Sequence, residues 1–154
     1  MKYIKTDRLF CFSPPIMLAT FVIEVALAVY VLWRYRSEKI TWLTVAILVF
    51  LALFQIAEYN VCEGAFGLDS LAWSRIGYAS ITILPALGLH AVITIAKVKQ
   101  KSLVLVGYAA AVGFAGFFLT VGNGLTGAVC TGNYVIFEIA QNILTLYAAY
   151  YYGF

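Results

Sequence analysis

Five long apolar stretches fill almost the whole of this 154-residue chain, and they limit what it can fold into. Hydrophobic residues make up 64% of the sequence and charged residues only 11%. A soluble domain of this size cannot bury so much apolar surface, so we expect the chain to fold in a lipid bilayer. The composition therefore predicts an all-α integral membrane protein.

Each stretch has about the twenty residues that cross a hydrocarbon core ~30 Å thick. The first begins with a helix signal. Ser13 can cap the free amides, and the missing N–H groups of Pro14 and Pro15 cost no hydrogen bond at a helix start. We expect one transmembrane domain, residues 1–154, with five spanning helices at 15–33, 42–60, 71–96, 103–121 and 133–152.

The basic residues predict the orientation. Six of the ten lie in two short loops between predicted spans and four lie on the opposite side, and the positive-inside rule works best in short loops. We therefore expect the N-terminus outside, in a multi-pass protein of the cell inner membrane. The net charge of +3 follows from this topology and indicates no nucleic-acid partner. The six are Arg34, Arg36, Lys39, Lys97, Lys99 and Lys101, and the four are Lys2, Lys5, Arg8 and Arg75.

This orientation places all three cysteines, Cys11, Cys62 and Cys130, on the outer side. In an oxidising compartment two of them could form a disulfide and leave one over. Three unpaired thiols are the alternative, and a metal or covalent ligand is a less favoured one.

Three glutamates lie inside predicted spans: Glu24, Glu58 and Glu138. A carboxylate in a bilayer is costly, so each should face protein, water or a bound ligand. Arg75 begins the third span at about the depth of Glu58, which predicts an ion pair between them.

Polar residues at helical spacing continue from two of these acids. In the second span Gln55 shares a face with Glu58, and in the fifth Gln141 and Asn142 share a face with Glu138. Together they could line one cavity that opens outward, although interhelical hydrogen bonds or a proton or ion route would use the same residues. The candidate ligand-binding residues are Gln55, Glu58, Arg75, Glu138, Gln141, Asn142 and Glu24.

Other polar and small residues have structural interpretations. His90 is predicted to form an interhelical hydrogen bond, since a single histidine supplies neither bis-histidine haem ligation nor a catalytic zinc site. We found no catalytic motif and expect no metal site, and the sequence does not specify a cofactor. Small residues around Ala111 predict close packing of the fourth span. Aromatic residues at span ends, expected as interfacial anchors, are Trp33, Trp42, Trp73, Tyr147 and Tyr150.

Residues 42–96 carry an ordered set of motifs, which are Gln55-x-x-Glu58-Tyr59, Trp73-x-Arg75-x-x-Tyr78 and Leu84-Pro85-x-Leu87-x-Leu89-His90. This third of the chain resembles the membrane-embedded seven-helix region at the N-terminus of many bacterial sensor histidine kinases and related receptors. The segments Cys11-Phe-Ser-Pro-Pro15 and Cys130-Thr-Gly-Asn-Tyr134 are also similar to a group of uncharacterised small bacterial and archaeal membrane proteins. The resemblance implies a receptor-like helical bundle. The receptor region has seven spans and this chain is predicted to have five. The difference implies an incomplete bundle, or a bundle that a partner completes.

We therefore expect a non-enzymatic membrane protein, either a receptor-like module that binds a small ligand, lipid or quinone, or an accessory subunit of a membrane complex. Its expected partners are the lipid bilayer and other membrane subunits or further copies of itself. The alternative is a proton- or cation-handling membrane enzyme or transporter that uses Glu24, Glu58 and Glu138. The lack of an evident internal repeat argues against a secondary transporter.

Overall fold

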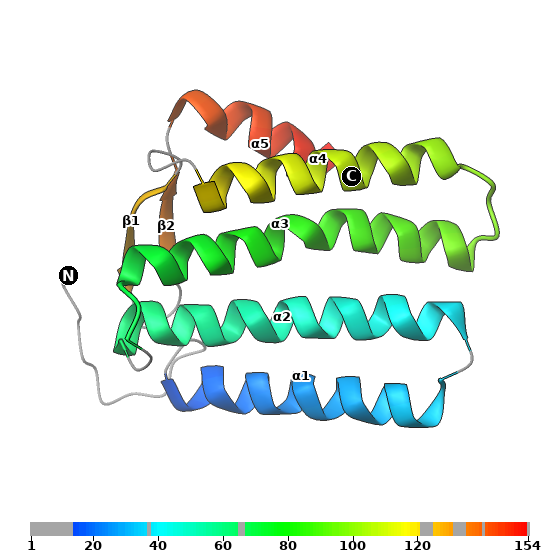
Figure 1. The fold of residues 1–154 in the computed structure, drawn as a ribbon, viewed down its shortest axis with the longest axis horizontal. Coiled ribbons are helices and arrows are strands. Elements are labelled where there is room, and N and C mark those ends of the chain that lie inside the picture. Colours follow the sequence, from blue (N-terminus) through cyan, green and yellow to red (C-terminus); the bar gives the residue numbers. More distant parts are fainter. Residues whose placement is uncertain are drawn as a thin grey trace.

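The structure, a computed structural model, describes residues 14–36, 38–64, 67–120, 125–130, 135–139 and 141–153. These residues form four long helices, a two-stranded antiparallel hairpin and a short helix (Figure 1). The elements are α1 (Pro14–Arg34), α2 (Lys39–Glu63), α3 (Ser70–Ile95), α4 (Lys101–Thr120), β1 (Leu125–Cys130), β2 (Val135–Ile139) and α5 (Gln141–Gly153). Helices α1 to α4 are long and apolar enough to cross a membrane, which indicates a membrane-embedded multi-pass protein.

The four long helices lie side by side in a row, and each runs antiparallel to the one before it (Figure 1). They pack in chain order: α1 on α2, α2 on α3, and α3 on α4. Within the described residues no comparable packing joins α1 to α3 or α4. Helix α1 therefore lies at the edge of the row, and only Met17 and Ala28 are buried along its length.

Local signals set the helix ends that face the hairpin. Gly64 adopts a left-handed conformation (φ 67°) after α2, and its N–H donates to the carbonyl of Asn60 at 2.9 Å. Asp69 precedes α3 and accepts a hydrogen bond from the N–H of Ala72 at 2.9 Å, as an N-cap residue does. These caps end one helix and begin the next within a short turn.

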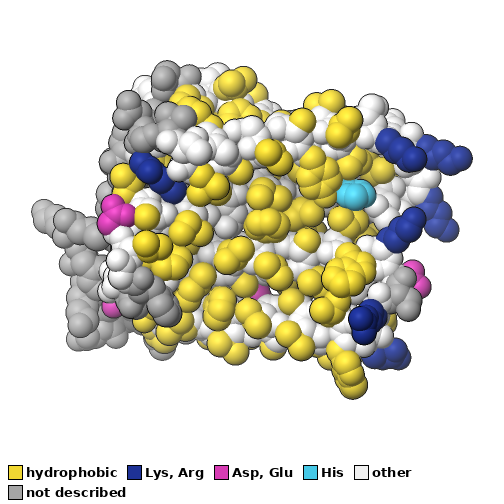
Figure 2. Space-filling view, viewed as in Figure 1, with side chains coloured by type: hydrophobic (Ala, Val, Ile, Leu, Met, Phe, Trp, Pro, Cys, Tyr) yellow, Lys and Arg dark blue, Asp and Glu magenta, His cyan; other side chains and the backbone are white. Residues whose placement is uncertain are grey.

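Most lysine and arginine side chains gather at the opposite end of the row, while hydrophobic side chains cover its middle (Figure 2). This end carries the α1–α2 and α3–α4 turns, as Figure 1 shows. The sequence correctly placed these two basic turns on one side.

The fifth spanning helix predicted at 133–152 is not supported, because only its C-terminal part is helical. Residues Val135–Ile139 form strand β2, which pairs antiparallel with β1 in a register that runs from Cys130 opposite Val135 to Leu125 opposite Ile139. Four of the five β2 residues are β-branched or aromatic, types that favour strands. Helix α5 has 13 residues, about 20 Å of helix, which is shorter than a ~30 Å hydrocarbon core. The described residues thus contain four spanning helices, and a fifth is not supported.

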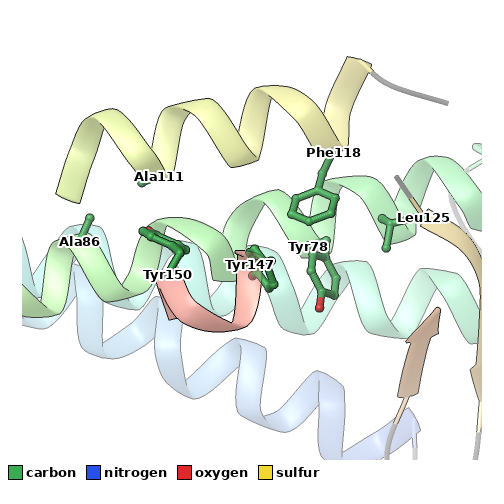
Figure 3. Close-up of a cluster of buried hydrophobic side chains, with 7 residues drawn as sticks. All are labelled: Tyr78, Ala86, Ala111, Phe118, Leu125, Tyr147 and Tyr150. Carbon is green, nitrogen blue, oxygen red and sulfur yellow. The ribbon is translucent and has the colours of Figure 1, made fainter. Parts of the chain in front are cut away.

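The buried core lies where α3, α4, α5 and β1 meet (Figure 3). Aromatic rings from different elements make edge contacts in it, with 4.8 Å between the centroids of Tyr78 and Phe118 and 5.1 Å between Phe118 and Tyr147. The close packing predicted for the fourth span is found in part. Gly107, Ala111 and Ala115 are buried, whereas Gly113 and Gly116 have open space beside them. The core residues are Tyr78, Ala86, Ala111, Phe118, Leu125, Tyr147 and Tyr150.

Candidate functional site

Buried polar side chains gather at the hairpin end of α2 and α3. Glu58 is 2% exposed, Asn60 1% and Ser74 0%, although all three belong to helices that are otherwise apolar. Strand β1 packs against both helices at this end. The site is therefore a polar region enclosed by α2, α3 and the hairpin.

Most of these polar groups are satisfied within their own helices. The hydroxyl of Ser74 donates to the carbonyl of Ser70 at 2.8 Å, and the amide of Asn60 donates to the carbonyl of Ile56 at 2.6 Å. Such bonds remove the cost of burying a donor and need no ligand. They leave two acceptors, because Glu58 Oε2 and Asn60 Oδ1 are buried without a hydrogen-bond partner in the described part of the chain.

The ion pair predicted between Glu58 and Arg75 is not found. Within the described part of the chain the Glu58 carboxyl makes no ion pair, and Arg75 is half-buried on α3 with other contacts. Equal depth places two residues at the same height in the membrane, but it does not fix the side of each helix on which they lie. Gln55 and Glu58 do share one helix, where Gln55 is half-buried one turn away.

Glu24 lies at the midpoint of α1, ten residues after Pro14 and ten before Arg34. It is about 15 Å from either helix end, which is the centre of a membrane span. Its side chain is half-buried, and the Oε2 atom is buried with no hydrogen-bond partner. The nearby hydroxyl of Thr20 donates to the carbonyl of Ile16 at 2.9 Å, one turn back along the same helix.

The second predicted polar stripe is wrong, because its residues do not share one helix. Glu138 lies in strand β2 opposite Gly127, and the helix begins only at Gln141, whose side chain is exposed. The side chains of Glu138 and Asn142 lie outside what the structure describes. Of the predicted ligand-binding residues, the structure therefore places Gln55 and Glu58 together, with Glu24 at mid-depth on the edge helix.

A hydrogen-bonded cluster around Thr82 was missed by sequence reasoning, which assigned Tyr147 and Tyr150 to the membrane interface. Both tyrosines are 5% exposed. The Tyr147 hydroxyl lies 2.9 Å from Thr82 Oγ1, and the Tyr150 hydroxyl donates to the Thr82 carbonyl at 2.7 Å. Pro85, three residues later in the same helix, has no N–H to donate to the carbonyl of residue 81, so α5 is attached next to a missing helix hydrogen bond. The sequence signal for this cluster was the i, i+3 spacing of the two tyrosines, which places them on one helix face.

The interhelical role predicted for His90 is confirmed. Its Nδ1 atom lies 3.1 Å from the hydroxyl of Tyr108, which joins α3 to α4.

Cys62 is disulfide-bonded, which selects the disulfide over three unpaired thiols, the two alternatives that the sequence left open. It lies on α2 one turn beyond Glu58, while the side chains of Cys11 and Cys130 lie outside the described residues. Among the residues that the structure describes, no three histidine, cysteine, aspartate or glutamate side chains come together as a metal site.

No protein-family model, no curated protein and no solved structure matches this chain. The resemblance of residues 42–96 to sensor-kinase membrane regions therefore stays a prediction.

Proposed function

We propose that the protein is a non-enzymatic, receptor-like membrane module that works as an accessory subunit of a larger helical assembly. The observation that carries this proposal is Glu24, at the midpoint of the edge helix. A carboxyl group at that depth is costly unless a donor reaches it, and interhelical hydrogen bonds are a common way to supply one. A helix from a second copy or from another subunit, packed against α1, would provide the donor.

The uncovered face of α1 supports this contact. Ile23, Leu27 and Tyr30 follow the i, i+4, i+7 spacing of one helix face and are 58%, 46% and 52% exposed. Exposed apolar residues alone would fit lipid equally well. Glu24 is half-buried and lies one turn before Ala28, which faces into the row, so its side chain stands at the border between that side and the exposed face.

Photo-crosslinking tests the proposal in the native membrane. A benzophenone side chain at Ile23 should give a discrete protein–protein adduct, and the same group at Val112 of α4, which is 68% exposed, should give lipid adducts only. Glu24→Leu should weaken the association about 3- to 30-fold, the range expected for one interhelical hydrogen bond, because it removes the acceptor. Glu24→Gln should retain most of it, since an amide still accepts and donates.

Two outcomes would contradict the proposal. Ile23 could crosslink to lipid alone, or positions 23 and 112 could give the same adducts in equal yield. An adduct that persists unchanged in Glu24→Leu would show that the contact does not depend on the carboxyl group.

We also propose that the hairpin end faces outside and that the protein belongs to the cell inner membrane. The Cys62 disulfide supports this orientation, since disulfides persist in oxidising compartments. The basic turns at the other end support it as well, because positive residues stay in the cytoplasm. A ligand of the receptor-like module would then reach Gln55 and Glu58 from the outer side.

A second candidate function, proton or cation handling, is favoured by Glu58 alone. The residue is 2% exposed, and its Oε2 atom has no hydrogen-bond partner among the described residues, as expected of a group that takes up a proton or a cation. A pH- or sodium-driven flux through reconstituted vesicles, lost in Glu58→Gln, would select this function over the assembly role.

A further inference from the structure

The seam between α1 and α2 carries two adjoining cavities of different chemical character. The first is an apolar groove of about 330 Å³ between the middles of the two helices, lined by residues that include Phe21, Val25, Ala28, Val45, Val49 and Ala52. The second, of about 410 Å³, lies at the α1–α2 turn and is lined by Val29, Leu32, Trp33, Arg36 and Trp42. Val29 and Leu32 line both cavities, so the groove continues into the polar end.

The second cavity has the chemistry of a headgroup site. Trp33 and Trp42 are 80% and 56% exposed, and indole rings favour the membrane–water interface. Arg36 follows the end of α1, is exposed, and has no ion-pair partner among the described residues. The neighbouring Arg34 guanidinium instead lies over the ring of Tyr35, 5.3 Å from its centroid. Arg36 is thus the cation at the mouth of the groove, and guanidinium groups bind phosphate oxygens in pairs.

We propose that this seam binds one anionic phospholipid of the surrounding bilayer. An acyl chain occupies the apolar groove, and the phosphate lies at Arg36 between the two tryptophans. The arrangement follows the lipid itself, since an apolar channel at membrane depth leads to a cavity at the interface whose one basic lining residue is Arg36. A zwitterionic headgroup offers the same phosphate but brings a second positive charge close to Arg36, so an anionic headgroup is favoured.

The lipid site is independent of the proposed assembly face. The groove is lined by Val25, Val29 and Leu32. The assembly face is formed by Ile23, Leu27 and Tyr30, each of which lies two residues before one of them. Two residues correspond to a rotation of about 200°, so the two sets lie on roughly opposite sides of α1. A lipid in the groove and a partner helix on α1 can therefore be present together, and either proposal can fail alone.

Native mass spectrometry of the full chain, delipidated in detergent and then supplied with defined lipids, tests the site. The wild-type protein should retain one molecule of phosphatidylglycerol in preference to phosphatidylcholine of the same chain length. Arg36→Gln should weaken phosphatidylglycerol retention roughly tenfold, the loss expected for one charge-assisted hydrogen bond. Lys99→Gln removes the same charge from the α3–α4 turn and should behave as wild type.

A second variant tests the chain-binding part. Val49→Phe fills the groove from an exposed position, so it should lower retention of both lipids, while Val112→Phe on α4 should not. Because positions 36, 49, 99 and 112 are all exposed, these variants should fold, and circular dichroism confirms it. The proposal is overturned if Arg36→Gln and Lys99→Gln weaken retention equally, or if the two lipids are retained alike by the wild-type protein.

Discussion

At the scale of single residues, Thr82 holds α5 against the row of helices. Its hydroxyl donates to the Tyr78 carbonyl at 2.7 Å and meets the Tyr147 hydroxyl, and its own carbonyl accepts from Tyr150. All of these groups are buried, so each bond that is lost leaves a polar atom without water to replace it.

Removing one of these hydroxyls should be measurable. Tyr150→Phe deletes the donor to the Thr82 carbonyl and should lower the free energy of unfolding by about 1 kcal/mol. Tyr152→Phe removes the same group from a side chain that is 86% exposed and should change stability little. Unfolding in mixed micelles, followed by circular dichroism, compares the two, and equal effects would show that the Tyr150 bond contributes nothing.

The residue scale also shows how far the sequence could identify the site. Glu24 and Glu58 stand out because acids are rare in apolar spans, and the structure leaves an oxygen of each without a hydrogen-bond partner. The ion pair predicted between Glu58 and Arg75 failed because it rested on depth alone. Depth along a helix is a local property, while rotation about the helix axis depends on the neighbouring elements. The spacing of the two tyrosines indicated a shared face, but it could not identify Thr82 as their partner, because Thr82 lies 65 and 68 residues away.

At the scale of elements, hydropathy predicted the four long helices and failed at the fifth. An apolar segment of β-branched and aromatic residues satisfies the pattern of a spanning helix and that of a strand. Pairing with β1 decides between the two structures, and hydropathy contains no information on such pairing.

The packing of α4 provides a prediction at this scale. Ala111 is 0% exposed and belongs to the core shared with α3 and α5, so Ala111→Leu should push these helices apart. We expect it to lower the free energy of unfolding by about 1–3 kcal/mol, the usual cost of overpacking. Ala109→Leu adds the same volume on the exposed side of α4 and should cost much less. Similar losses in the two variants would contradict the assigned packing face.

At the scale of the whole molecule, the sequence did not predict that the four long helices form a row. The sequence predicted a receptor-like bundle, but spans and loops do not determine whether antiparallel helices close into a ring or remain in a line. That choice depends on contacts between helices that are distant in sequence, and α1 makes few of them.

The orientation of the molecule can be tested by thiol labelling of intact cells. A membrane-impermeant reagent should label the protein more strongly after mild reduction, because the Cys62 disulfide is then open on the outer side. In Cys62→Ser the former partner of Cys62 should react without reduction. If the reduced wild-type protein and the Cys62→Ser variant are both labelled only in permeabilised cells, the orientation is the opposite of the proposed one.

The linear order of the row bears on how the chain is assembled during synthesis. Each long helix packs on the one made just before it, so its contacts have low sequence separation, and such contacts form quickly. Every helical hairpin can therefore pair as it enters the bilayer, before the next helix is translated. The attachment of α5 to Thr82 bridges 65 and 68 residues, and it can form only after α3 and α4 are already in place.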